Sequence, residues 1–232
     1  AHVRMTEEAG PICAGMTTQE ANKAIADYLV ESGAMFAQQH IVHQYPHCWR
    51  CKHPILFRAT EQWFCSVDSI KEQAVDAINK VQWIPAWGKD RITSMVRERN
   101  DWCISRQRRW GVPIPIFYCK DCGEPLMRKD IMLRVSKLFG EKGSDAWYTT
   151  EPEEILPEGT TCPKCGGHSF VKERDIMDVW FDSGVSHAAV ADQRPELHWP
   201  ADLYLEGADQ YRGWFQSSLL TSVAWRGQAP YK

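Results

Sequence analysis

Apolar residues recur at helical spacing in three stretches of the chain. The first opens with Thr17-Thr18-Gln19-Glu20, which has capping-box spacing, and ends at Gly33, which supplies a stop signal. Its apolar positions are Ala21, Ala24, Ile25, Tyr28 and Leu29. The second stretch opens at Ser69-x-x-Glu72 and continues to Val81, and the third covers residues 89–99. The pattern therefore predicts helices over 17–33, 69–81 and 89–99.

Short extended runs are predicted between and after these helices. They cover residues 55–59 and 62–66, and later the segments DIMDVWF (175–181) and DLYLEG (202–207). The last of these runs directly into a helix predicted from Asp209 to about Val223. Strands that alternate with helices are typical of an α/β protein with a mainly parallel sheet. We therefore predict that fold class for the chain.

Residues 117–172 differ from the rest because they hold four cysteines, several glycines and many charges, with little periodic apolar pattern. Cys119-Lys-Asp-Cys122-Gly and Cys162-Pro-Lys-Cys165-Gly have the form of two zinc knuckles. In a knuckle, a tight turn brings two thiolates onto one ion and the following glycine accepts a positive φ. Four sulfurs complete a tetrahedral shell, so the segment is predicted to be an insertion held by structural Zn²⁺. Reduced, merely buried cysteines are the alternative.

Cys48-Trp-Arg-Cys51 is a third pair with knuckle spacing. Its partners are not evident, because the lone cysteines Cys13, Cys65 and Cys103 do not form a knuckle. Two interpretations stay open: a metal half-site completed by a pair outside this chain, or a free pair. A thioredoxin-like redox role is less favoured, because no suitable βαβ pattern surrounds the pair.

Composition and charge narrow the classes of function. The formal net charge of −3 lacks the basic field expected when phosphate contacts dominate affinity, which disfavours a zinc-ribbon nucleic-acid-binding module as the alternative function. No apolar run approaches the roughly 20 residues that span a bilayer. The first residues, AHVRMTEEAG, lack the apolar core of a secretory signal, so we expect a cytoplasmic protein without membrane partners.

The segment 203–210 predicts a ligand site where a strand turns into a helix. In open parallel sheets, ligands bind at the carboxyl ends of strands. Glu206 is placed to pair with a cation such as a substrate ammonium, and Gly207 allows close backbone approach. Asp209 and Gln210 could bind ribose hydroxyls; the alternative is that they only cap the helix.

Large aromatic and cationic side chains supply further candidates. Trp180 and Trp214 offer stiff apolar walls for a pocket that measures an aliphatic side chain, although a tryptophan taken singly more often belongs to the core. Arg106, Arg108 and Arg109 could clamp phosphate or carboxylate groups. A solvated charge cluster is the alternative for these arginines.

Three spaced segments carry a resemblance to a known family. They are YPHCWRC (45–51), WCISRQRRWGVPIP (102–115), and DVWFDSG (178–184) together with YLEGADQYRGWFQSSL (204–219). With these motifs the chain resembles the class I aminoacyl-tRNA synthetases of the valine, leucine and isoleucine group. The valyl and leucyl branches share forms of the SRQ-x-x-WG segment and remain an alternative. The first and last segments resemble the isoleucyl branch.

The resemblance implies a Rossmann catalytic domain, interrupted by insertions, that activates isoleucine with ATP and Mg²⁺ and esterifies it to tRNA(Ile). It implies that Glu206, Gly207, Asp209 and Gln210 hold the isoleucyl-adenylate, with Trp180 and Trp214 lining the isoleucine pocket. Editing of misacylated valine is expected as well, because apolar pockets discriminate poorly by one methylene, a limit for which isoleucine and valine selection in this family is the standard example.

The resemblance also implies a division of the chain. Residues 1–55 resemble the C-terminal part of the editing insertion, 56–116 a segment associated with the catalytic domain, 117–172 a zinc-binding insertion, and 173–232 the second half of the Rossmann domain. The family's His-x-Gly-His and Lys-Met-Ser-Lys-Ser signatures are not found in this sequence. We therefore expect an inactive internal fragment of a monomeric parent enzyme, with no complete set of catalytic residues.

Overall fold

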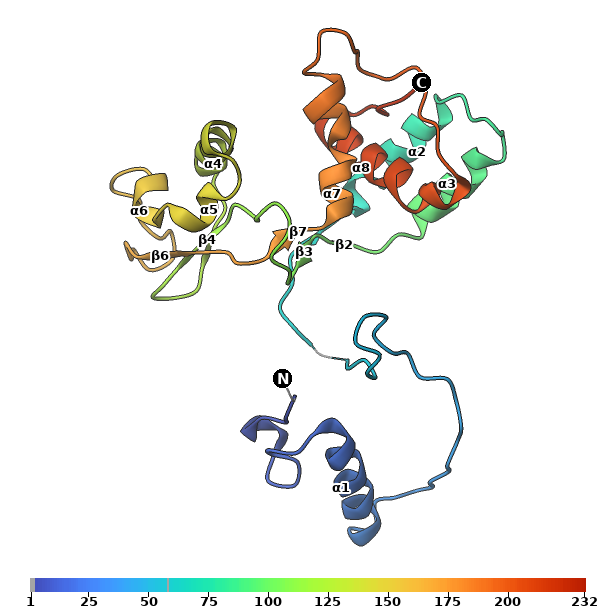
Figure 1. Cartoon of the computed structure of the whole chain (residues 1–232), viewed down its shortest axis with the longest axis vertical. Helices are drawn as coiled ribbons and strands as arrows, with labels where there is room; N and C mark the ends of the chain where they lie inside the picture. Colours follow the sequence, from blue (N-terminus) through green and yellow to red (C-terminus); the bar gives the residue numbers. More distant parts are fainter. Residues whose placement is uncertain (1–2, 58) are drawn as a thin grey trace. The chain divides into compact units, whose positions relative to one another are not determined.

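The structure of the protein is a computed structural model that describes residues 3–57 and 59–232. The chain divides into two compact units, Ala1–Ala59 and Thr60–Lys232, and Figure 1 shows the elements of each. Among the described residues, no helix has both the length and the apolar character that a bilayer crossing requires.

The first unit contains one long helix. α1 (Thr18–Glu31) begins after Thr17, and the predicted capping box between Thr17 and Glu20 is present in both directions. A 3-10 turn, η1 (Glu7–Ala9), precedes it. The helix buries only Ala21, so its position is set by local capping signals more than by a packed core.

The second unit has two hydrophobic cores, and the first is helical. Figure 1 shows four helices gathered around it: α2 (Lys71–Asn79), α3 (Gly88–Arg97), α7 (Val179–Gly184) and α8 (Trp214–Arg226). α8 is buried along most of its length, as expected for a helix inside a core. The fully buried side chains of this core include Ile78, Ile92 and Leu219.

The second core belongs to residues 117–172. Its three-stranded antiparallel sheet has the order β5-β4-β6. The elements are β4 (Phe117–Cys119), β5 (Pro125–Leu126), α4 (Lys129–Lys142), α5 (Ala146–Thr149), α6 (Pro152–Ile155) and β6 (Phe170–Lys172). Trp147 is fully buried, with its ring centroid 5.0 Å from that of Phe117. The weak periodicity of this segment gave no sign of α4, which buries only Ile131 and Val135.

The helix predicted at 69–81 is present as α2, and the helix predicted at 89–99 is present as α3. The start of α2 differs from the prediction. A 3-10 turn, η2 (Asp68–Ile70), precedes α2, and no side chain caps that helix. The helix therefore begins two residues after the predicted opening at Ser69. Instead, Lys71 pairs with Asp68 across 2.6 Å, a contact that favours the 3-10 turn.

The strand ladders of the described residues are short and antiparallel. β1 (Phe64–Cys65) pairs with β2 (Trp102–Cys103), and β3 (Ser105–Arg106) pairs with β7 (Ile176–Met177). The one parallel bridge within the described ranges joins Ala201 to Tyr231. The described residues therefore mix helices and strands as predicted but do not form a mainly parallel sheet. Two neighbouring parallel strands must be joined by a crossover connection. Within the described ranges, the bridge between Ala201 and Tyr231 is the one parallel pairing.

Two predicted strands give way to other structure. In DIMDVWF the strand ends at Met177, because the Asp178 side chain accepts from the Trp180 N–H and starts α7. DLYLEG is extended but has no ladder of its own, and a 3-10 turn, η4 (Ala208–Tyr211), separates it from α8. The predicted direct strand-to-helix turn is therefore wrong.

The run predicted at 55–59 forms no ladder in the described residues. Arg58 lies outside the described residues, and the neighbouring contact is an isolated bridge from His47 to Pro54. Within the run at 62–66, only Phe64 and Cys65 are paired. Apolar alternation alone does not make a strand where no partner lies alongside.

A partly buried hydrogen-bond cluster joins the second core to the strand segments. Glu173 Oε2 accepts from the Tyr118 hydroxyl at 2.5 Å and from Trp63 Nε1 at 2.9 Å. Burial alone would raise the pKa of Glu173, but these bonds and two backbone N–H groups outweigh it and lower that pKa. The carboxylate therefore stabilises the fold above the unfolded-state value of 4.5, and this contribution is lost as the pH falls through the lower folded-state pKa.

We expect Glu173→Gln to lower the free energy of unfolding at pH 7 by about 1 kcal/mol, a modest value because the carboxyl is only partly buried. The difference from wild type should vanish at a pH below the folded-state pKa. Urea titrations at several pH values measure it. Glu153→Gln, at an exposed position of the neighbouring segment 117–172, is the control and should match wild type throughout.

Candidate functional site

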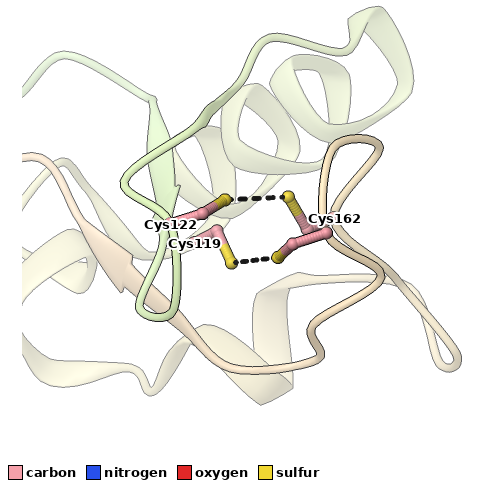
Figure 2. A group of neighbouring side chains, drawn as sticks. Cys119, Cys122 and Cys162 are labelled. Atoms are coloured by element: carbon pink, nitrogen blue, oxygen red, sulfur yellow. Dashed lines mark hydrogen bonds between the residues drawn. The ribbon is translucent and has the colours of Figure 1, made fainter.

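The four cysteines of the two knuckles converge on one point. Each sulfur lies within 4.8 Å of the other three. Cys119 Sγ lies 3.5 Å from Cys165 Sγ, and Cys122 Sγ lies 3.6 Å from Cys162 Sγ. Figure 2 shows Cys119, Cys122 and Cys162 in this cluster. Sulfurs about 2.3 Å from a central zinc ion would form a tetrahedron with edges of roughly 3.8 Å. The donor set and its spacing therefore fit a metal ion held by four sulfurs.

Both knuckles have the predicted turn geometry. Gly123 and Gly166 have φ of +72° and +76°, and each donates its N–H to the carbonyl of the first cysteine of its knuckle at 2.9 Å. The backbone N–H of Cys165 lowers the pKa of the Cys162 thiol to about 7. The backbone N–H of Gly167 lowers the pKa of Cys165, but the neighbouring thiols outweigh it and raise that pKa to about 12. A thiolate is the form that binds metal, so the case for ligation rests on the geometry of the four sulfurs.

The third pair has the same backbone turn in the first unit. Lys52 N–H donates to the Cys48 carbonyl at 2.8 Å, and Lys52 has a φ of +60°, which is uncommon for a residue with a Cβ. The backbone N–H of His53 lowers the pKa of the Cys51 thiol. No third metal donor joins Cys48 and Cys51 among residues 3–57 and 59–232.

The aromatic candidates meet at a glycine that the sequence analysis did not single out. A Cβ on Gly213 would lie 3.0 Å from the Trp180 ring and 2.5 Å from Gln210 Oε1, so a side chain here would require Trp180 and Gln210 to shift. Gln210 Oε1 accepts from the Trp214 backbone N–H at 3.0 Å. In this structure Gln210 therefore caps the start of α8, which was the alternative to binding a ligand. Trp214 stacks on Tyr204 with 4.1 Å between ring centroids.

The remaining predicted residues lie on the extended segment and η4. Glu206 is exposed and lines a cavity of about 260 Å³ together with Tyr211. Gly207 has a φ of −70°, so its role does not rest on a left-handed conformation. Asp209 Oδ2 accepts from Gln210 Nε2 at 3.0 Å. Gln210 therefore lies with Trp180 and Trp214 around Gly213, Asp209 lies beside Gly207, and Glu206 lines a cavity that neither tryptophan lines.

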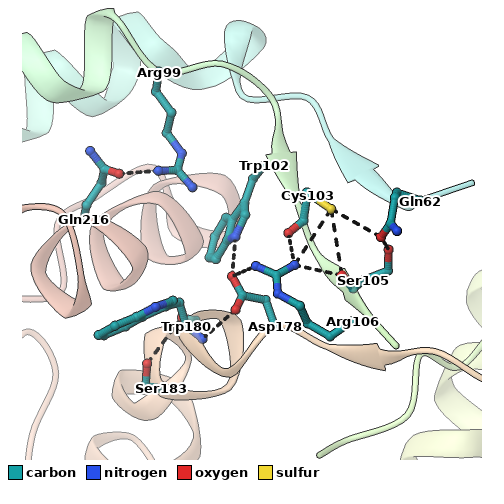
Figure 3. A network of polar contacts seen from close by, with 10 residues as sticks. All are labelled: Gln62, Arg99, Trp102, Cys103, Ser105, Arg106, Asp178, Trp180, Ser183 and Gln216. Atoms are coloured by element: carbon teal, nitrogen blue, oxygen red, sulfur yellow. Dashed lines mark hydrogen bonds and ion pairs between the residues drawn. The ribbon is translucent and has the colours of Figure 1, made fainter. Parts of the chain in front are cut away.

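A buried carboxylate anchors the wall of this site, as Figure 3 shows. Asp178 is 4% exposed, and its Oδ2 accepts from Trp102 Nε1 at 2.9 Å and pairs with Arg106 at 3.1 Å. Its Oδ1 accepts from the Trp180 N–H at 3.4 Å. The Asp178 side chain thus holds Trp102, Arg106 and the first turn of α7 in place.

A cavity of about 330 Å³ lies beside this carboxylate, lined by Arg99, Arg106, Trp180 and Arg212 among others. The Arg99 guanidinium donates to Gln216 and lies over the Trp102 ring, 5.1 Å from its centroid. Burial lowers the pKa of Arg99, against the raising effect of Asp178. Arg99 gave no signal in the sequence, because its burial depends on residues far along the chain.

The three arginines of the motif separate into two environments. Arg106 is held by Asp178 and also donates to the Cys103 and Ser105 carbonyls at 2.7 and 2.8 Å. Arg108 and Arg109 are exposed. A joint clamp of all three is therefore not formed, and the solvated alternative fits Arg108 and Arg109.

The sequence as a whole matches one family model. The model for class I tRNA synthetases (I, L, M and V) aligns with residues 9–232. The chain belongs to this family. Its mixture of helices and strands is consistent with the α/β class expected for a member of it.

Curated relatives agree with that family. The chain is 63% identical to a protein named isoleucine–tRNA ligase from Thermoanaerobacter sp. (strain X514), over 96% of the chain and 24% of that relative. It is 63% identical to the protein of the same name from Carboxydothermus hydrogenoformans, over 98% of the chain and 25% of the relative. It is 59% identical to the protein of the same name from Moorella thermoacetica, over 99% of the chain and 24% of the relative. The chain thus spans about a quarter of the length of these relatives.

Proposed function

We propose that this chain is part of an isoleucine–tRNA ligase, which joins isoleucine to tRNA(Ile) with ATP and Mg²⁺. The 63% identity to proteins of that name, over nearly the whole chain, carries this proposal. A valyl or leucyl enzyme is the alternative that this identity disfavours. We further propose that the chain supplies one part of a Rossmann catalytic domain and does not complete adenylation by itself.

In this proposal the isoleucyl-adenylate lies against η4 and the start of α8. The Glu206 carboxylate pairs with the amino group, and Gly207, Asp209 and Gln210 hold the polar part of the adenylate. Trp180 and Trp214 form the apolar walls that contact the isoleucine side chain. The close approach of Trp180 to Gly213 supports this role, since it fixes a flat wall beside η4.

The four knuckle cysteines, Cys119, Cys122, Cys162 and Cys165, are proposed to bind structural Zn²⁺. All four coordination positions are filled by protein sulfur, which leaves no open position for water or substrate. When bound, the ion supplies cross-linking of the two knuckles and no chemistry of the reaction. The compact sulfur cluster and the glycine turns support this proposal.

The first unit is proposed to be the end of the editing insertion that removes misacylated valine, with a domain boundary near residue 55. Boundaries near 116 and 172 would then enclose the zinc-binding insertion. Cys48 and Cys51 are proposed as half of a second metal site, whose other donors the described residues do not supply. The knuckle-like turn at Lys52 supports this assignment.

Binding of a non-hydrolysable isoleucyl-adenylate, isoleucyl-sulfamoyl-adenosine, tests the proposed site by calorimetry. We expect Glu206→Gln to weaken binding by about tenfold or more, because a charge-assisted hydrogen bond to the ammonium group is lost. Glu196→Gln, an exposed carboxylate outside the site, is the control and should bind as wild type does. Equal binding by the Glu206 variant, or robust isoleucine-dependent ATP–pyrophosphate exchange by this chain, would contradict the proposal.

A further inference from the structure

The cavity of about 330 Å³ beside Asp178 has an excess of positive charge in its lining. The charged residues that line it are three arginines, Arg99, Arg106 and Arg212, and two aspartates, Asp101 and Asp178. Three positive charges against two negative ones leave a net charge of +1. A cleft with charge of one sign concentrates ions of the opposite sign, so the cavity attracts anions.

One arginine and one aspartate of this lining neutralise each other. Asp178 pairs with Arg106 at 3.1 Å, and the same carboxylate accepts hydrogen bonds from two tryptophan N–H groups. Asp178 therefore serves the fold and leaves little capacity for the other cations. No ion pair within 4.0 Å joins Arg99 or Arg212 to a carboxylate among residues 3–57 and 59–232.

Arg99 is a half-buried cation whose hydrogen bonds are incomplete. One of its terminal nitrogens donates to the amide oxygen of Gln216, and its Nε is fully buried without a partner. The other terminal nitrogen, Nη2, donates to no atom of the described residues, and it is not fully buried. Figure 3 shows the guanidinium pointing between Gln216 and Trp102. Burying a charge with one neutral partner costs free energy, and an anion at Nη2 would offset that cost.

Arg212 supplies the second cation. It follows η4 and is exposed. Burial is the main cause that lowers the pKa of Arg99, and repulsion from Arg212 adds to it, against the raising effect of Asp178. The two guanidinium groups are therefore close enough to disfavour each other's charge. An anion between them would relieve this repulsion.

We propose that this cavity binds a terminal phosphate group, as the free ion or as a monoester, between Arg99 and Arg212. Guanidinium groups bind phosphates and carboxylates through paired hydrogen bonds. A terminal phosphate carries about two negative charges near pH 7 and directs its oxygens tetrahedrally. A carboxylate has one charge and two oxygens in a plane. Two cations that approach from separate elements, the end of α3 and the end of η4, therefore favour phosphate.

This site is separate from the one proposed for isoleucyl-adenylate. Of the residues assigned to the adenylate, Trp180 alone lines this cavity, and Glu206 lines another. Phosphate binding therefore does not rest on the proposed function. Glu206→Gln, which should weaken the binding of isoleucyl-sulfamoyl-adenosine, should leave phosphate binding unchanged, so the two proposals can fail independently.

Inorganic phosphate, methyl phosphate and acetate are the probes, titrated at constant ionic strength into the 232-residue chain labelled with ¹⁵N-arginine. Both phosphates should shift the Nε resonances of Arg99 and Arg212 saturably, and acetate should bind about fivefold or more weakly because it carries less charge. Shifts with inorganic phosphate alone would support the free ion as the ligand. Absence of a saturable shift, or acetate binding as tightly as inorganic phosphate, would overturn the proposal.

Two charge changes at exposed positions of the lining should act in opposite directions. Arg212→Gln should weaken inorganic phosphate by about fivefold, because a charge-assisted hydrogen bond is lost. Asp101→Asn should strengthen it by about twofold, because a like charge is removed. Arg97→Gln and Asp90→Asn, exposed on α3 and outside the lining, are the matched controls and should change affinity less than about twofold. Unchanged affinity in Arg212→Gln, or an equal loss in Arg97→Gln, would sink the assignment.

Discussion

If the four cysteines bind zinc as proposed, we expect replacement of Cys162 with alanine to abolish metal binding and to unfold residues 117–172. A structural zinc ion contributes about 10 kcal/mol or more to the folding of a small domain, far more than this insertion's modest core can replace. We expect about one equivalent less zinc by elemental analysis. Limited proteolysis should then cut within 117–172, while the helical core around α8 stays protected because it has its own buried side chains.

The matched control for this experiment is Cys65→Ala. Cys65 is an exposed thiol of the same unit that takes no part in the sulfur cluster, so zinc content should stay unchanged and stability should move by less than about 0.5 kcal/mol. Full zinc content in purified Cys162→Ala protein, together with an intact insertion, would refute the metal assignment.

Asp178→Ala will cause the largest loss of stability among single changes near the candidate substrate site. The substitution leaves the buried Trp102 N–H without its acceptor and removes the partner of Arg106 and the cap of α7. Breaking a buried pair of this kind costs about 3–5 kcal/mol. We expect the lower end, about 3 kcal/mol, because the Arg106 side chain is 41% exposed and regains water. Urea unfolding followed by tryptophan fluorescence measures it.

Two further variants test whether the burial of Asp178 is the cause of this loss of stability. Asp178→Asn retains an acceptor oxygen for the Trp180 N–H and should lose only about 1–2 kcal/mol. Asp130→Ala breaks an ion pair with Arg128 in which both side chains are about half exposed, and its free energy of unfolding should stay close to that of wild type. A loss from Asp178→Ala no larger than that from Asp130→Ala would show that the network does not anchor the site.

Features that depend on nearby residues were predictable from the sequence. The capping box of α1 and the glycine turns of both knuckles each involve residues no more than four positions apart, and the structure has them as expected. Cysteine spacing was informative for the same reason, since each knuckle is a local turn. The convergence of the two knuckles followed from metal chemistry, which requires four donors at one point.

Features that depend on distant partners were not predictable. DIMDVWF has the alternation of a strand. However, Asp178 accepts a hydrogen bond from Trp102, 76 residues earlier, and caps the start of α7. Similarly, DLYLEG has strand composition without a partner beside it. Gly213 gave no signal because the ring that a Cβ would approach belongs to Trp180, which is remote in the sequence. A single sequence shows the residues of such contacts but not which of them meet.

The pairing of β4 with β6 has a consequence for how this protein could have evolved. Phe117 lies opposite Lys172 in an antiparallel register, so the insertion leaves and rejoins the rest of the chain at neighbouring points, roughly 5 Å apart. A segment with adjoining ends can be gained, lost or exchanged through a short turn without moving the helical core. In this chain, a change in the length of the insertion between its paired ends need not displace the helical core.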